Sequence, residues 1–224
     1  ALLAVCTLLL CGCKKPLYRP GTNARQAVVI PPQAGVPDHY WKVASNVHLY
    51  HFEQGCGEPV VVLHGGPGYP ENEPWPGLSA LGTNHRFVYF HERGCGRSSR
   101  PIDRFSSRNY YRNMLELEAS LGLAEQIRDI ERIRQILGVK RLDIIGHSFG
   151  GFVGALYAAE YPDRVKKLIL VAPAEVVVMP AKNGGLYAQV GRILPSALNP
   201  EYRAWLKRFF AYGSIFQKSE KELS

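Results

Sequence analysis

The segment Gly146-His147-Ser148-Phe149-Gly150 constrains the fold more than any other part of the chain. The apolar residues before it predict a strand at 141–145, and the small residues after it predict a helix at 149–160. A serine flanked by glycines at a sharp strand-to-helix turn is the geometry that exposes a nucleophilic hydroxyl at the edge of a sheet. The pattern therefore predicts Ser148 as a nucleophile, the alternative being a structural Gly-Ser turn.

Strand-like and helix-like stretches alternate along the rest of the chain, which predicts an α/β fold with a mostly parallel sheet flanked by helices. Residues 124–137 carry isoleucines and leucines at spacings of three and four, which predicts an amphipathic helix ending at Gly138. Residues 165–171 form a continuous apolar run, which is typical of a buried parallel strand. Further strands are expected at 46–52, 59–63 and 86–90, the first two paired as a hairpin.

A second glycine-rich segment, His64-Gly65-Gly66-Pro67-Gly68, follows the expected strand at 59–63. Acyl transfer produces a tetrahedral oxyanion that needs preorganised N–H donors, one after the nucleophile and one from an early strand loop. The backbone N–H groups of Phe149 and Gly66 are the candidates for this oxyanion hole. The alternative for this segment is a plain Gly/Pro loop.

A third segment, His91-Glu92-Arg93-Gly94-Cys95-Gly96-Arg97-Ser98, follows the expected strand at 86–90. Together the three segments resemble the α/β-hydrolase fold and, more narrowly, the proline iminopeptidase-like serine peptidases, over about residues 47–174. His91 and Glu92 stand where that family usually has Asp-Gln. The resemblance implies an aminopeptidase that forms a Ser acyl-enzyme on small peptides, with no metal or organic cofactor. An esterase or lactonase with the same nucleophile is the alternative enzyme.

Glu71 and Glu73 lie just past the second segment and are the candidates for binding the α-ammonium of an aminopeptidase substrate. A hydrogen bond to such a charged group contributes about 1.5–3 kcal/mol. The alternative is that both carboxylates are solvated loop residues.

The triad in this fold runs in the order Ser, acid, His, but all seven histidines precede Ser148. We therefore expect a chain truncated at both ends, inactive alone, with residues 175–224 as the start of a helical lid and the last strands lying beyond it. Glu175 is a further candidate acid. A protein that truly ended here would instead be a non-catalytic surface lipoprotein that binds a partner through aromatic residues in 202–216.

The N-terminal residues have the pattern of a secreted lipoprotein. Residues 1–10 are apolar, and Leu10-Cys11-Gly12-Cys13 resembles the lipobox of bacterial lipoproteins, which predicts a lipid on Cys13. We expect a signal segment at 1–13, a Pro-rich tether at 14–37 and the core at 38–174, anchored to a membrane of the bacterial envelope. The alternative is an uncleaved, buried apolar segment.

The net charge of +8 and the pI of about 9.3 are interpreted as a solvated basic surface. The densest basic stretch has neither zinc-ligand spacing nor an RNA-binding aromatic pattern, so nucleic-acid binding is not expected. No run reaches the roughly 18 apolar residues that span a bilayer. Cys56 and Cys95 are expected at opposite ends of the sheet, beyond disulfide reach.

Overall fold

The computed structural model describes residues 27–105 and 107–174, with isolated positions between 192 and 204. Cys13, Glu175, the aromatic residues in 202–216 and all but the last part of the expected tether lie outside the described residues. The same is true of nearly all of the expected lid, so these remain predictions. Within the described ranges, no helix combines the length and the apolar character needed to cross a membrane.

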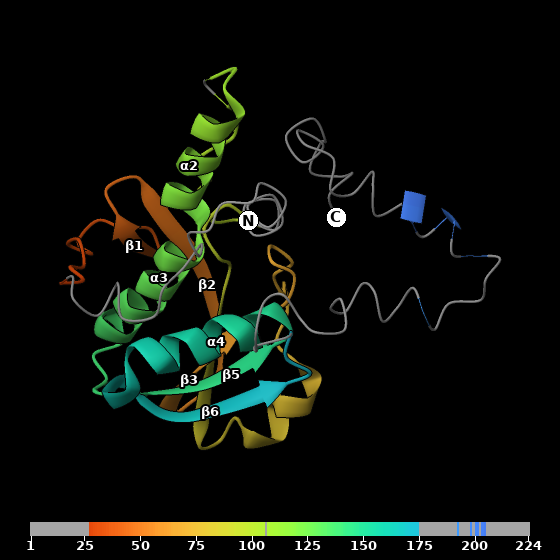
Figure 1. Cartoon of the computed structure of the whole chain (residues 1–224). Helices are drawn as coiled ribbons and strands as arrows, with labels where there is room; N and C mark the ends of the chain where they lie inside the picture. The colour runs from red at the N-terminus through yellow and green to blue at the C-terminus, as the bar shows by residue number, and fades with distance from the viewer. Residues whose placement is uncertain are drawn as a thin grey trace.

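A six-stranded sheet in the order β1-β2-β4-β3-β5-β6 forms the centre of the fold (Figure 1). The strands are β1 (Tyr40–Ala44), β2 (Val47–Gly55), β3 (Glu58–Leu63), β4 (His85–Phe90), β5 (Leu142–His147) and β6 (Val165–Val171). Strands β4, β3, β5 and β6 are mutually parallel, whereas β1 and β2 are antiparallel to their neighbours. The predicted mostly parallel sheet is confirmed.

Helices pack on both faces of this sheet. The described helices are η1 (Pro76–Leu81), α2 (Tyr110–Leu121), α3 (Leu123–Ile136), α4 (Phe149–Glu160) and η2 (Pro162–Arg164). Alternate residues of β3 point to opposite faces: Val61 and Leu63 pack with α3 and α4, whereas Val60 and Val62 pack with residues around η1. The predicted amphipathic helix is confirmed as α3, with Gly138 just beyond it at a positive φ of 69°. In Figure 1, α2 extends away from the sheet.

The expected hairpin between 46–52 and 59–63 is wrong. β2 pairs with β1 and β4, and β3 lies between β4 and β5. β3 is buried from Pro59 to Leu63, and such a strand is stable between two parallel neighbours with both faces covered. β2 starts with alternating buried and half-buried side chains, which suits a strand nearer the sheet edge.

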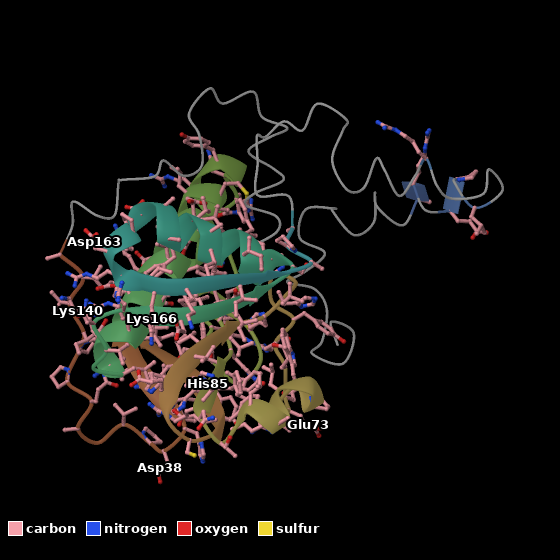
Figure 2. All side chains as sticks on the ribbon, turned by 90° about the horizontal axis from the view of Figure 1, so that it is seen from below. Asp38, Glu73, His85, Lys140, Asp163 and Lys166 are labelled. Carbon is pink, nitrogen blue, oxygen red and sulfur yellow. The ribbon has the colours of Figure 1, made fainter. Side chains whose placement is uncertain are left out.

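The expected burial of residues 165–171 is not seen among the described residues. β6 pairs with β5 as a parallel strand, but Ile169, Leu170 and Val171 are 52%, 43% and 38% exposed. β6 is the last strand of the described sheet, and among the described residues it has a strand neighbour on one edge only. Figure 2 labels residues on the outside of the fold: Lys140, Asp163 and Lys166 lie near the starts of β5 and β6, away from Glu73.

Candidate active site

Ser148 occupies the sharp turn between β5 and α4. Its backbone has φ 50° and ψ −116°, a conformation that a non-glycine residue holds only when its surroundings enforce it. Its N–H donates to the carbonyl of Val171 at 3.0 Å, and its carbonyl accepts from the N–H groups of Gly151 at 3.0 Å and Ala174 at 2.8 Å. The turn is therefore fixed by the end of β6 as well as by its own helix.

The glycines on either side of Ser148 are required by close backbone contacts. A Cβ added to Gly146 would lie 2.7 Å from the carbonyl oxygen of Gly150. A Cβ added to Gly150 would overlap the carbonyl oxygen of Leu63, at the end of β3. These contacts bring the turn directly against the neighbouring strand, so the loop after β3 lies beside Ser148.

The loop after β3 approaches the side chain of Ser148 through Gly65. A Cβ added there would lie 3.3 Å from the Cβ of Ser148. The Gly65 carbonyl accepts from the N–H of Tyr69 at 3.3 Å and lies 2.8 Å from Nδ1 of His64. Since C=O and the following N–H point in opposite directions across a trans peptide, the N–H of Gly66 points away from His64.

The N–H of Phe149 is the second predicted oxyanion donor. Phe149 is the first residue of α4, so its N–H has no acceptor within the helix, and the helix N-terminus favours negative charge. The structure therefore places Phe149 directly after Ser148 and Gly66 one residue beyond Gly65, which approaches the Ser148 side chain. An oxyanion hole formed by the N–H groups of Gly66 and Phe149 stays a prediction.

Two buried histidines near this turn have both ring nitrogens engaged. His64 is fully buried, and its Nε2 accepts a hydrogen bond from the N–H of Glu92 at 3.2 Å. Its other ring nitrogen, Nδ1, contacts the Gly65 carbonyl, which can only accept, so the ring proton is assigned to Nδ1. His91 accepts from the N–H of Arg97 at 2.9 Å and contacts the carbonyl of Glu71 at 3.0 Å. Burial lowers the pKa of His91. Neither ring is free to act as a general base.

The loop after β4 contacts the loop after β3 through the hydrogen bond from the Glu92 N–H to His64. Its Arg93 makes two hydrogen bonds to Asp129 of α3, from Nε at 2.6 Å and Nη2 at 2.7 Å. Its Ser98 donates to the carbonyl of His91 at 2.7 Å and accepts from the N–H of Tyr50 at 2.9 Å. The motif was recognised in the sequence, but no sequence pattern indicates which of its side chains point inward. Glu92, which the sequence marked only as a departure from the family pattern and not as a site residue, is buried here, at 8% exposure.

The two carboxylates proposed for the substrate ammonium differ in their surroundings. Glu71 is half-buried, and its Oε1 accepts from Nε1 of Trp75 at 3.1 Å. The Trp75 ring lies edge-on to that of His147, with centroids 5.8 Å apart, so Glu71 is connected to the residue preceding Ser148. Glu73 is exposed, and Figure 2 shows it on the outside of this loop.

No group of three or more possible metal ligands occurs among the described residues. Cys56 is exposed and Cys95 is buried, and both thiols are free. Burial raises the pKa of the Cys95 thiol, which keeps it protonated and unreactive.

Known proteins match this chain in sequence and fold. The sequence profile of the alpha/beta hydrolase fold matches residues 58–211. A cis-3-alkyl-4-alkyloxetan-2-one decarboxylase from Shewanella oneidensis is 34% identical over 127 residues, 55% of this chain and 35% of the relative. A proline iminopeptidase from Heyndrickxia coagulans is 34% identical over 121 residues, 54% of this chain and 37% of the relative. The chain thus covers little more than a third of the length of either protein.

Among solved structures, a putative alpha/beta hydrolase from Nostoc sp. PCC 7120 is similar, with a TM-score of 0.48 and 23% identity. The match covers 75% of this chain and 50% of the Nostoc protein.

Proposed function

The chain belongs to the α/β-hydrolase family, and we propose that the complete protein is a serine hydrolase of the proline iminopeptidase type. In this proposal it releases an N-terminal residue such as proline from a small peptide through an acyl-enzyme on Ser148. The observation that supports the proposal is the strained turn that holds Ser148 against Gly65 of the loop after β3.

The proposed reaction has two steps. Ser148 Oγ bonds to the carbonyl carbon and loses its proton to a general base, while the N–H groups of Gly66 and Phe149 stabilise the oxyanion. Collapse of this intermediate breaks the amide bond, the leaving amine takes up the proton, and water then hydrolyses the acyl-enzyme. Every histidine of the 224 residues precedes Ser148, whereas the base of this fold follows the serine. The proposal therefore requires the acid and histidine from the complete protein, without which these residues alone would be inactive.

The test uses the complete protein with two substrates, a prolyl-naphthylamide and a p-nitrophenyl ester of similar size. We expect turnover of the amide, and a loss of more than about a thousandfold in kcat in Ser148→Ala. Labelling of Ser148 by a fluorophosphonate provides a readout independent of the leaving group. Absence of both labelling and turnover would contradict a serine hydrolase and favour the non-catalytic surface lipoprotein.

We propose that Glu71 binds the α-ammonium of the substrate, because its carboxylate is hydrogen-bonded to Trp75, whose ring lies against that of His147. Glu73 is the matched control, since it is exposed on the same loop. Glu71→Gln should raise KM for the prolyl amide by about tenfold or more, as expected for the loss of a charge-assisted hydrogen bond, and Glu73→Gln should not. An equal effect of the two substitutions would contradict this assignment.

An esterase or lactonase is the second candidate, because a relative of equal identity is named for an oxetan-2-one, which is a cyclic ester. The same nucleophile and donors serve an ester, since the fold does not select the acyl group. Ester turnover without amide turnover in the test above would favour this candidate.

We also propose that the protein is anchored to the bacterial envelope by a lipid on Cys13. The support is the sequence of residues 10–13. Labelling of the protein in cells with an alkyne fatty acid tests this proposal, and Cys13→Ser should abolish the label. Unchanged labelling in that variant would contradict it.

A further inference from the structure

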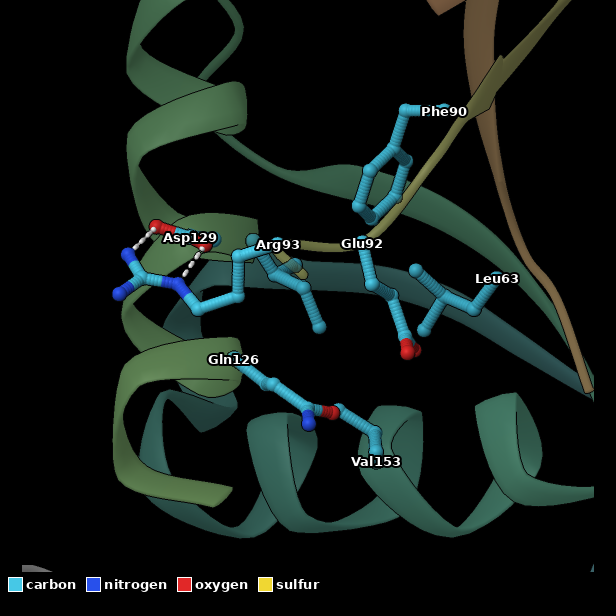
Figure 3. A pocket seen from close by; sticks show the side chains of 8 residues that line it. Leu63, Phe90, Glu92, Arg93, Gln126, Asp129 and Val153 are labelled. Atoms are coloured by element: carbon cyan, nitrogen blue, oxygen red, sulfur yellow. Dashed lines mark hydrogen bonds and ion pairs between the residues drawn. The ribbon is translucent and has the colours of Figure 1, made fainter. Parts of the chain in front are cut away.

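Glu92 is a buried carboxyl group with no cationic partner. Its carboxyl oxygen accepts the N–H of Gly68, and it lies 3.9 Å from Nε2 of His64. That nitrogen is an acceptor for the N–H of Glu92 itself, so the His64 ring is neutral. The adjacent Arg93 pairs with Asp129 instead (Figure 3). An ionised carboxylate at this position would be both desolvated and unpaired, which is strongly unfavourable.

A small cavity lies beside Glu92 and Gln126, and the side-chain oxygen of Gln126 has no hydrogen-bond donor. The cavity measures about 10 Å³, near the smallest volume that holds one water molecule, and both Glu92 and Gln126 line it. Gln126 of α3 is 5% exposed; its Nε2 donates to the carbonyl of Leu121 at 3.0 Å, while its Oε1 is buried and has no partner. In Figure 3 the side chains of Glu92 and Gln126 extend toward the same space.

These two groups are complementary. A buried acceptor almost always has a donor, and a neutral carboxyl group on Glu92 would supply one to the cavity that both side chains line. The other carboxyl oxygen remains available to the N–H of Gly68, in the loop of residues 64–68, which we name the oxyanion loop.

We propose that Glu92 is a positioning residue of the oxyanion loop: as a neutral acid it accepts the Gly68 N–H and donates toward Gln126 Oε1, directly or through one water molecule. The role rests on the proposed function, because it acts through the Gly66 donor. Glu92 links the oxyanion loop to α3, and its own N–H fixes the His64 ring that contacts the Gly65 carbonyl.

The surroundings of Glu92 favour its neutral form. Burial, the largest influence, raises the pKa of Glu92, and the Asp129 carboxylate raises it further. A positive charge on His64 would lower the pKa of Glu92, but its Nε2 accepts the Glu92 N–H, so this charge is absent; the hydrogen bond from the Gly68 N–H lowers the pKa by a smaller amount. The polar side chains around Glu92 come from three elements. His64 follows β3, Arg93 and Cys95 belong to the same loop as Glu92, and Gln126 and Asp129 belong to α3. From α4 only the apolar Val153 lines the cavity.

The sign of the pH dependence follows from the raised pKa. The stabilising contribution of Glu92 is fully present below its unfolded pKa of about 4.3, and it is lost as pH rises through the folded pKa. Glu92→Gln keeps the size of the side chain and both hydrogen-bonding functions but cannot ionise. The variant should therefore gain stability relative to the natural protein as pH rises from about 5 to 9.

The first experiment measures urea unfolding midpoints of the complete protein across this pH range, for the natural sequence, Glu92→Gln and the control Asp163→Asn. Asp163 is an exposed carboxylate, so its variant should show a constant difference. If the difference in unfolding midpoint between Glu92→Gln and the natural protein were also independent of pH, the proposal that Glu92 is neutral would be overturned.

The second experiment measures hydrogen exchange of the Gly68 amide. Glu92→Leu should speed exchange about tenfold, the equivalent of one net hydrogen bond, and Glu92→Gln should leave it unchanged. Unchanged exchange in Glu92→Leu would overturn the positioning role.

Kinetics of the same variants test the connection to the reaction. We expect Glu92→Leu to lower kcat at least tenfold with little change in KM, and Glu92→Gln to retain kcat; equal kcat in all three proteins would overturn the role in catalysis. Absence of turnover in the natural protein would contradict the proposed function, whereas the stability and exchange results test the state and contacts of Glu92 by themselves.

Discussion

Arg93→Met breaks the most deeply buried ion pair of the described residues, and its cost follows from the geometry. The side chains of Arg93 and Asp129 are 4% and 3% exposed and share two hydrogen bonds. The substitution leaves the carboxylate of Asp129 with Arg132 as its remaining cation, at 2.7 Å. It also removes the contact of Arg93 with Glu125 at 3.4 Å and its hydrogen bond to the Ser120 carbonyl at 2.9 Å. We therefore expect a cost of about 3 kcal/mol, the lower end of the range for breaking a buried pair and a large part of the 5–15 kcal/mol that stabilises a typical domain.

A matched control exists in the same sheet. Arg86 donates from Nη1 to both carboxylate oxygens of Glu53, at 3.0 and 2.8 Å, but these side chains are 31% and 29% exposed. Water replaces the lost contacts there, so Arg86→Met should cost no more than about 1 kcal/mol. The two arginines thus differ in burial and in the additional contacts of Arg93 with Glu125 and Ser120.

Urea unfolding of the complete protein, followed by fluorescence, measures both costs. The double variant Arg93→Met/Asp129→Leu should regain part of the lost stability, because the buried carboxylate that lost Arg93 is removed as well and Arg132 keeps Glu125 at 3.3 Å. Equal costs for Arg93→Met and Arg86→Met, or a double variant less stable than Arg93→Met, would refute the reasoning.

Two further predictions concern the turn and the sheet. Gly150→Ala should abolish activity and destabilise the fold, because its Cβ overlaps the backbone of Leu63, whereas Gly77→Ala has open space and should be neutral in assays of activity and unfolding. Burial lowers the pKa of His51 to about 4, so the unfolded chain takes up its proton first and stability should fall as pH drops from about 6.5 to 4. Unfolding midpoints of His51→Phe should lack this loss, and an identical pH profile would contradict the assignment.

The elements with strong local signals were predictable from the sequence. The helix at 124–137 and the Ser148 turn are marked by periodicity and by glycines, which act over a few residues. Because parallel strands end at the same edge of a sheet, the loops after β3, β4 and β5 are brought together once the strands are recognised. Their association did not require knowledge of the strand order.

Pairings that depend on distant residues were not predictable in the same way. The apolar run of β3 does not say that β4, more than twenty residues later, separates it from β2. α2 was missed although Asn109 caps it and Met114, Leu117 and Leu121 form its buried side, because basic residues dominate the preceding stretch. The link from Glu92 to Gln126 depends on side-chain directions that only packing determines.

The conformation of Ser148 depends on a strand that is remote from it in sequence. The φ of 50° at Ser148 costs of order 1–3 kcal/mol unless neighbouring groups hold it. Two backbone hydrogen bonds help to hold it. One joins the N–H of Ser148 to the carbonyl of Val171, at the end of β6, and the other joins the N–H of Ala174, just beyond β6, to the carbonyl of Ser148. Because β6 is the most exposed strand of the described sheet, the pairing of β5 with β6 stabilises both the sheet and the conformation of Ser148.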